Sequence, residues 1–342
     1  MSARRLVLIA AIGFVAAILA YSLYWMHAAG QARNHVEAWA EARRAEGWSV
    51  AWAEETPSGF PWRLRLTLTA PELSHPSGLR WRGPYLELWT APLWPRAVHV
   101  ETAGNHTLTW GGRDWPLSLE RLPATIASGT LDAHLHGLET GQTSIADLGL
   151  SLAALPPRPD PSAHPARPDP SGHPASWRFA LSGRDIQLPP DTLPGFDGQM
   201  ALAEISGRVM GPIPADTPVA AIAGWSKQGG IIELDRVAVD WPPMGLEGSG
   251  TAALDPGGQP LVALSTRIHG FDALMDRLHQ AGLVDGATAR TSKTLLGLMA
   301  KPDPRGRPAI PAPITIQDGS LYLGPARMAA VPGIPWASFS PP

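Results

Sequence analysis

The chain has 342 residues, no cysteine, few charged residues and only three lysines among its 27 basic residues. Without cysteine it can form no disulfide, no thiolate metal site and no thiol nucleophile. Charged residues make up 17% of the sequence, and the formal net charge is −3 with a pI near 6.4. This balance gives no overall electrostatic footprint for nucleic acid, so we expect no nucleic-acid partner.

Phenylalanine and tyrosine are also scarce, at six and four residues, whereas tryptophan is frequent at 14. Eight of the tryptophans fall between Trp48 and Trp115. Aromatic residues suit strands, so the favoured interpretation is that they fill a sheet core, and the alternative is an aromatic groove for an acyl chain. The 35 glycines and 37 prolines argue against an all-helical bundle, and 44% apolar residues argue against wholesale disorder.

One long apolar run lies near the N-terminus. Residues 6–25 carry no charge, and a helix of about 20 residues spans the ~30 Å hydrocarbon layer of a bilayer. Arg4 and Arg5 precede the run, so residues 1–5 should stay in the cytoplasm and the bulk of the chain should be periplasmic. The sequence therefore predicts a single-pass inner-membrane anchor. The alternative is a cleaved signal peptide, because small residues follow at 28–30.

The pattern changes twice after the anchor. Residues 26–47 lack proline, show a loose helical periodicity and predict a helical stalk that ends at Gly47. From Trp48 onward the apolar residues alternate with polar ones. The strand Trp62–Leu68 should bury its leucines and leave Arg63 and Arg65 on a wet face. Further strands are predicted at 79–89, 106–110, 131–136, 143–152, 176–181, 201–209, 237–241, 246–254 and 261–268.

Tight turns separate these strands, and the Asp318-Gly319 pair predicts a hairpin between apolar runs. The expected fold is mainly β with a minor helical part: an extended, curved antiparallel sheet with one or two covering helices. Two β-rich lobes, 48–155 and 176–342, flank a proline-rich insert at 156–175, which we expect to be disordered or polyproline-like. A helix is predicted near 271–282, followed by a short apolar run at 295–299, both covering part of the sheet.

The search for catalytic or metal-binding patterns gives no candidate residues. The sequence has no Gly-x-Ser-x-Gly elbow, no zinc-binding His-Glu-x-x-His and no phosphate-binding loop. His134 and His136 share one strand face, but a polar solvent face explains them better than a metal site does. Glu54 and Glu55 are neighbours on a strand and point to opposite faces. We therefore expect no catalytic, cofactor-binding or metal-binding residues and no cofactor.

A short motif carries a family resemblance. After the anchor and stalk the chain reads Gly59-Phe60-Pro61-x-Arg63, followed by an alternating strand. This arrangement resembles the uncharacterised bacterial family DUF2125. The last hairpin, around Asp318-Gly319, is similar to the end of that family and of AsmA-like envelope proteins. The resemblance implies no catalytic residues. Independently, Gly59 suits a tight turn and Pro61 suits the start of a strand.

These observations favour a non-enzymatic, membrane-anchored periplasmic protein. By analogy with AsmA-like proteins, it is expected to act in lipid binding or outer-membrane homeostasis through an apolar sheet surface. The alternative is a scaffold that binds other envelope proteins through a sheet edge or the proline tract, and an enzyme ranks third. The candidate contacts for a ligand or lipid headgroup are Trp62, Arg63, Arg65, Trp81 and Trp89.

Overall fold

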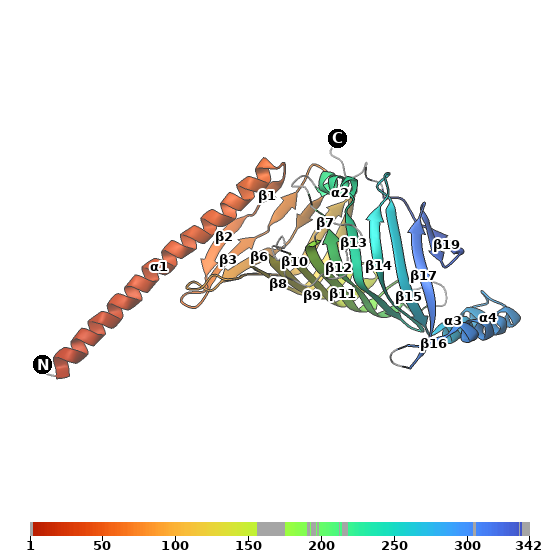
Figure 1. Cartoon of the computed structure of the whole chain (residues 1–342). Coiled ribbons are helices and arrows are strands. Elements are labelled where there is room, and N and C mark those ends of the chain that lie inside the picture. Colours follow the sequence, from red (N-terminus) through yellow and green to blue (C-terminus); the bar gives the residue numbers. More distant parts are fainter. Residues whose placement is uncertain are drawn as a thin grey trace, which may run out of the picture. The chain divides into compact units, whose positions relative to one another are not determined.

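A computed structural model describes residues 3–155, 175–189, 192, 196, 198–211, 213, 218–303, 306–334 and 336. Within these residues the chain forms four helices and 19 strands, and every strand pair is antiparallel (Figure 1). The contacts divide the chain into two units. Unit 1 comprises 1–117 and 121–128, and unit 2 comprises 118–120 and 129–342. The predicted fold class, mainly β with a minor helical part and an apolar N-terminal helix, is confirmed.

Unit 1 begins with one uninterrupted helix, α1 (Ala3–Ala45). The predicted anchor and stalk are thus parts of a single 43-residue helix. Gly47 ends it with φ +90°, a conformation that glycine adopts without strain. Among the described helices, α1 is the one with the length and apolar composition to cross a membrane. Beyond the apolar run, α1 contacts β1 and β3, and Ala29 and Ala40 are buried in that packing.

The strands of unit 1 pair in the order β2–β3–β6–β7–β5–β4–β1. Their bounds are β1 (Ser49–Ala51), β2 (Glu54–Ser58), β3 (Leu64–Thr69), β4 (Glu72–Ser74), β5 (Arg80–Arg82), β6 (Tyr85–Thr90) and β7 (Val98–Trp110). A further strand, β8 (Arg113–Ala127), contributes residues to both units.

Two sequence predictions in unit 1 need correction. The strand expected at 62–68 begins two residues later, and Trp62 lies outside it with 85% of its surface exposed. The strand expected at 79–89 is broken into β5 and β6 at Gly83-Pro84, where proline cannot donate to a ladder. Leu64, Leu66 and Leu68 do form the buried side of β3 as predicted, at 8%, 3% and 4% exposure.

Unit 2 is an open antiparallel sheet in which consecutive strands pair from β9 to β15; β17 then pairs with β15, β16 and β18, and β18 pairs with β19. Its strands are β9 (Thr130–Thr140), β10 (Thr143–Ala154), β11 (Ala175–Gln187), β12 (Gln199–Met210), β13 (Ile231–Trp241), β14 (Met244–Leu254), β15 (Pro260–His269), β16 (Lys301–Pro302), β17 (Pro308–Gln317), β18 (Ser320–Leu323) and β19 (Ala326–Ala330). The predicted hairpin is present, with Asp318 and Gly319 at φ +51° and +63° between β17 and β18.

Three shorter helices belong to unit 2: α2 (Pro218–Lys227), α3 (Phe271–Gln280) and α4 (Gly286–Met299). The predicted helix near 271–282 is α3, and α2 was not expected from the sequence. The apolar run at 295–299 forms the end of α4, but it is not buried against the sheet as predicted. Leu295, Leu298 and Met299 remain 58%, 81% and 50% exposed, because α4 packs chiefly against α3.

The boundary between the units differs from the predicted lobes. The first lobe was expected to reach residue 155, but β9 and β10 belong to unit 2. The reason is direct pairing across the insert: β10 pairs with β11 from Ser144↔Gln187 to Ala154↔Trp177. The insert itself, 156–175, lies outside the described residues, apart from Ala175, whose backbone begins β11.

Candidate functional site

The Gly59–Arg63 motif forms a tight turn between β2 and β3. The Arg63 amide donates to the Gly59 carbonyl oxygen over 2.9 Å, and Gly59 has φ +96°. A Cβ at Gly59 would lie 2.7 Å from the Arg63 carbonyl oxygen, so only glycine fits the turn. The Phe60–Pro61 peptide bond is cis. The turn is thus closed by a backbone hydrogen bond that a side chain at position 59 would obstruct.

The motif packs against the far end of the apolar run of α1. The Tyr21 hydroxyl donates to the Pro61 carbonyl oxygen, and Trp25 Nε1 donates to the Arg63 carbonyl oxygen over 3.1 Å. The Phe60 ring lies 5.9 Å from the Tyr21 ring and 5.7 Å, edge to face, from the Trp25 ring. The motif thus joins the first sheet of the chain to the aromatic end of its apolar helix.

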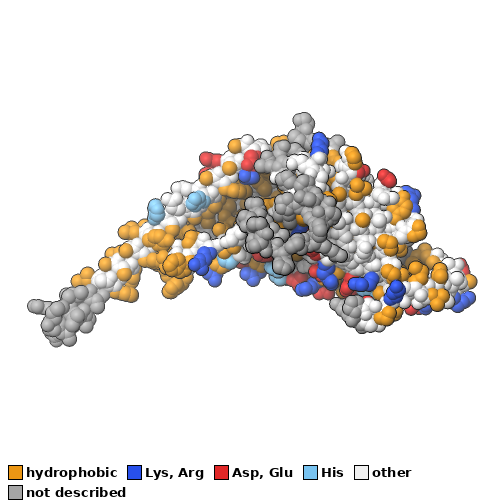
Figure 2. All heavy atoms as spheres, viewed as in Figure 1, with side chains coloured by type: hydrophobic (Ala, Val, Ile, Leu, Met, Phe, Trp, Pro, Cys, Tyr) orange, Lys and Arg blue, Asp and Glu red, His pale blue; other side chains and the backbone are white. Residues whose placement is uncertain are grey.

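A second loop, 91–97, meets α1 at the same level. The Tyr24 hydroxyl donates to the Pro92 carbonyl oxygen over 2.6 Å. We call the apolar side chains that these two loops expose the loop patch; they are Phe60, Trp62, Leu93 and Trp94, at 50%, 85%, 57% and 72% exposure. Figure 2 shows hydrophobic side chains gathered along α1 and beside it. Sequence reasoning missed this patch, because nothing in the local pattern places 91–97 beside residues 21–25.

The side chains of the other predicted contact residues contact residues of the strands. The Arg63 guanidinium lies 4.5 Å over the Trp89 ring, which stacks on His99 at 3.8 Å. Arg65 is half-buried and pairs with Glu87 at 3.5 Å, so this face of β3 is less exposed to solvent than predicted. Of the five candidates, Trp62 and Arg63 share one loop, Arg63 and Arg65 both lie beside Trp89, and Trp81 lies in β5.

Trp81 belongs to a buried cluster around a histidine. Its ring stacks on His106 at 5.7 Å with an interplanar angle of 16°. His106 is 3% exposed, and its Nε2 lies 3.4 Å from the Thr102 hydroxyl oxygen. Burial lowers the pKa of His106 below its ordinary value, because a charged imidazolium is poorly solvated there. This cluster is a packing site, since Gly83 closes directly over the imidazole ring.

The sheet of unit 2 has one apolar face. Directly opposed residues of neighbouring strands share a face, so a row can be followed from β9 to β18. This row, which we call the apolar row, comprises Leu131, Leu152, Phe179, Gly207, Leu234, Gly250, Leu264, Ile314 and Leu323. Two residues along the strands, the next row begins with Ala133, Leu150, Leu181, Ile205 and Val237.

The opposite face of the same sheet is charged and internally paired. Arg208 lies 2.9 Å from both Glu233 and Asp235, and Arg236 lies 3.1 Å from Glu204. Most residues of the two apolar rows are partly exposed, Leu181 to 39%, whereas Leu234 is buried at 6% exposure. Within the described part of unit 2, no side chain of either row is fully enclosed.

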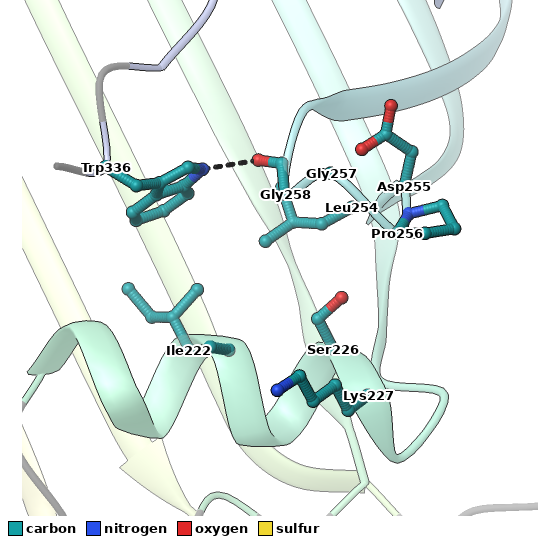
Figure 3. A pocket seen from close by; sticks show the side chains of 10 residues that line it. Ile222, Ser226, Lys227, Leu254, Asp255, Pro256, Gly257, Gly258 and Trp336 are labelled. Carbon is teal, nitrogen blue, oxygen red and sulfur yellow. Dashed lines mark hydrogen bonds between the residues drawn. The ribbon is translucent and has the colours of Figure 1, made fainter.

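A pocket lies at the end of the β14–β15 hairpin, beside α2 (Figure 3). It has a volume of about 620 Å³ and is lined by Ile222, Ala223, Ser226, Lys227, Leu254, Asp255, Pro256, Gly257, Gly258 and Trp336. Trp336 Nε1 donates to the Gly258 carbonyl oxygen over 2.7 Å. Leu254 lies four residues beyond Gly250 on β14, so it extends the same apolar face into the pocket.

Two of the titratable residues that the sequence singled out form ion pairs or close polar contacts with a neighbouring element. His136 Nδ1 lies 2.6 Å from Asp147 Oδ1 on the neighbouring strand. Glu55 pairs with Arg33 of α1 at 3.1 Å. Within the described ranges, no three histidine or acidic side chains converge in a way that would hold a metal ion.

The match to known families covers nearly all of this structure. A family model described as an uncharacterised protein conserved in bacteria, DUF2125, matches residues 25–332. The chain belongs to the DUF2125 family. The DUF2125 match begins at Trp25, the residue that donates to the motif, and ends after β19. A search of curated proteins and a search of solved structures each found no match.

Proposed function

We propose that this DUF2125 protein is a non-enzymatic, inner-membrane-anchored periplasmic protein that holds the acyl chains of a lipid on the apolar face of unit 2. The observation that carries the proposal is that face: leucine, isoleucine, valine and phenylalanine side chains stand in cross-strand register, and most of them are partly exposed in the described chain. A contiguous apolar face that remains partly exposed on a folded protein can serve as a binding surface.

The pocket beside α2 supports the same interpretation. Its volume of about 620 Å³ lies within the range of small-molecule sites, and Leu254 joins it to the apolar face. Lys227 at its rim makes no ion pair within the described residues, so it is available to an anionic headgroup. The expected role in outer-membrane homeostasis, by analogy with AsmA-like proteins, belongs to this proposal.

The contacts of α1 support an anchor that is retained. Cleavage at 28–30 would remove Tyr21, Tyr24 and Trp25, and with them three hydrogen bonds to the loops of unit 1. It would also end a helix that otherwise runs without a break to Ala45. A signal peptide that is cleaved off is not expected to form such hydrogen bonds with the folded domain.

Site-specific photocrosslinking in living cells tests lipid binding. A photoreactive amino acid at Leu181 lies on the apolar face, and the matched probe at Arg178 lies on the charged face of the same strand. We expect lipid adducts by mass spectrometry at Leu181 and not at Arg178. Equal lipid adducts at both positions, or a protein adduct in place of lipid at Leu181, would overturn the proposal, and the second result would favour the scaffold.

A further inference from the structure

The loop patch lies where α1 leaves its apolar run. Tyr21, Tyr24 and Trp25 form the end of that run, and all three donate hydrogen bonds to the two loops that carry the patch. Aromatic side chains with a polar group favour the membrane interface. If α1 spans the bilayer, these bonds hold both loops at the depth of the lipid headgroups.

The composition of the loops suits that environment. Phe60, Trp62, Leu93 and Trp94 present about half or more of their surfaces to the surroundings, although all four are large and apolar. Isolated exposed residues of this kind need no explanation, but four on two adjoining loops form a patch. The segments 59–63 and 91–97 contain no acidic residue.

Each loop also carries one exposed arginine. Arg63 follows Trp62, and Arg96 follows Trp94 by two residues. Neither guanidinium has an acidic partner within the part of the chain that the structure describes. Arginine beside tryptophan matches the lipid interface, where the ring enters the boundary of the acyl chains and the guanidinium meets a phosphate.

We propose that the loop patch inserts into the periplasmic leaflet of the membrane that α1 crosses, with Arg63 and Arg96 bound to lipid phosphates. Unit 1 then holds the membrane at a second point beside its helix. The DUF2125 motif gains a role in this arrangement, because it shapes the turn that presents Trp62 while it binds Tyr21 and Trp25. The inference rests on the proposed anchor and is independent of lipid binding by unit 2.

The absence of cysteine makes a direct depth measurement available. We would introduce single cysteines as Trp62→Cys, Leu93→Cys and Pro76→Cys, and label each with an environment-sensitive fluorophore. Pro76 is the matched control, an exposed residue of unit 1 in the turn next to His75, whose ring lies 4.7 Å from that of Trp48 beyond the other end of α1. The full chain is reconstituted into vesicles of phosphatidylethanolamine and phosphatidylglycerol in equal parts.

Insertion predicts a blue-shifted emission at Trp62 and Leu93, with quenching by nitroxide lipids several-fold stronger than at Pro76. Because the vesicles hold no other protein and the quencher is in the lipid, strong quenching identifies the bilayer. Equal, weak quenching at all three positions in a protein whose intact mass includes α1 overturns the insertion and leaves the anchor standing. A mature protein in cells that lacks α1 overturns both. Unchanged thermal unfolding of each labelled variant verifies that the fold is retained.

Discussion

At the residue scale, Gly59 is constrained both by its backbone angle and by its surroundings. Gly78 provides a matched control, with φ +87° but nothing near the position of a Cβ, whereas Gly59 has a carbonyl oxygen 2.7 Å away. Gly78→Ala should cost about 1–2 kcal/mol, the usual penalty of a left-handed alanine. Gly59→Ala should cost clearly more in urea unfolding of the full chain. Equal losses would show that the motif turn relaxes around the added methyl group.

His106 makes the stability of unit 1 depend on pH. Burial lowers its pKa in the folded state, so the unfolded state binds the proton more readily. The stabilisation from a neutral His106 is complete above the unfolded pKa of about 6.5 and is lost as pH falls below it. We expect the melting temperature of the parent protein to drop from pH 7.5 to about 5.5. His106→Gln should show a smaller drop, and the exposed control His35→Gln should behave as the parent; a drop unchanged in His106→Gln would exclude this histidine as the source.

At the element scale, β3 has one buried face and one face that is partly exposed to solvent. Leu66→Ala should lower the free energy of unfolding by about 2–5 kcal/mol, because it removes burial and leaves a cavity. Arg65→Ala removes a partly exposed ion pair with Glu87 and should cost less than about 1 kcal/mol. Chemical denaturation of both variants measures the difference. A Leu66→Ala variant as stable as Arg65→Ala would contradict the placement of this strand.

The accuracy of the sequence predictions also varies by element, for physical reasons. Alternation placed the leucines of β3 correctly, and Asp318-Gly319 marked its hairpin, because both signals are local. Trp62 follows the alternation but belongs to the turn that Gly59 and Arg63 close, so the alternating pattern begins two residues before the strand itself. The loop patch depends on hydrogen bonds between residues about 40 and 68 positions apart, which no local period records.

At the scale of the whole molecule, the proposed membrane topology rests on one charge asymmetry. Arg4 and Arg5 precede the apolar part of α1, and positive residues remain on the cytoplasmic side. We expect a C-terminal alkaline phosphatase fusion to be active and a C-terminal green fluorescent protein fusion, exported through the general secretion route, to be dark. If the green fluorescent protein fusion were fluorescent and the alkaline phosphatase fusion inactive, the C-terminus would lie in the cytoplasm and the proposed orientation would be reversed.

The packing of α1 has a practical consequence for producing the protein. Ala29 and Ala40 are 6% and 0% exposed, so one side of the second half of the helix packs against the sheet of unit 1. A chain that starts at Trp48, where the strands begin, would lack the helix that packs against β1 and β3. The apolar surface of these strands would then be exposed to water. A soluble sample should instead start near Ala28. This start removes the apolar segment and keeps the part of the helix that packs against the sheet.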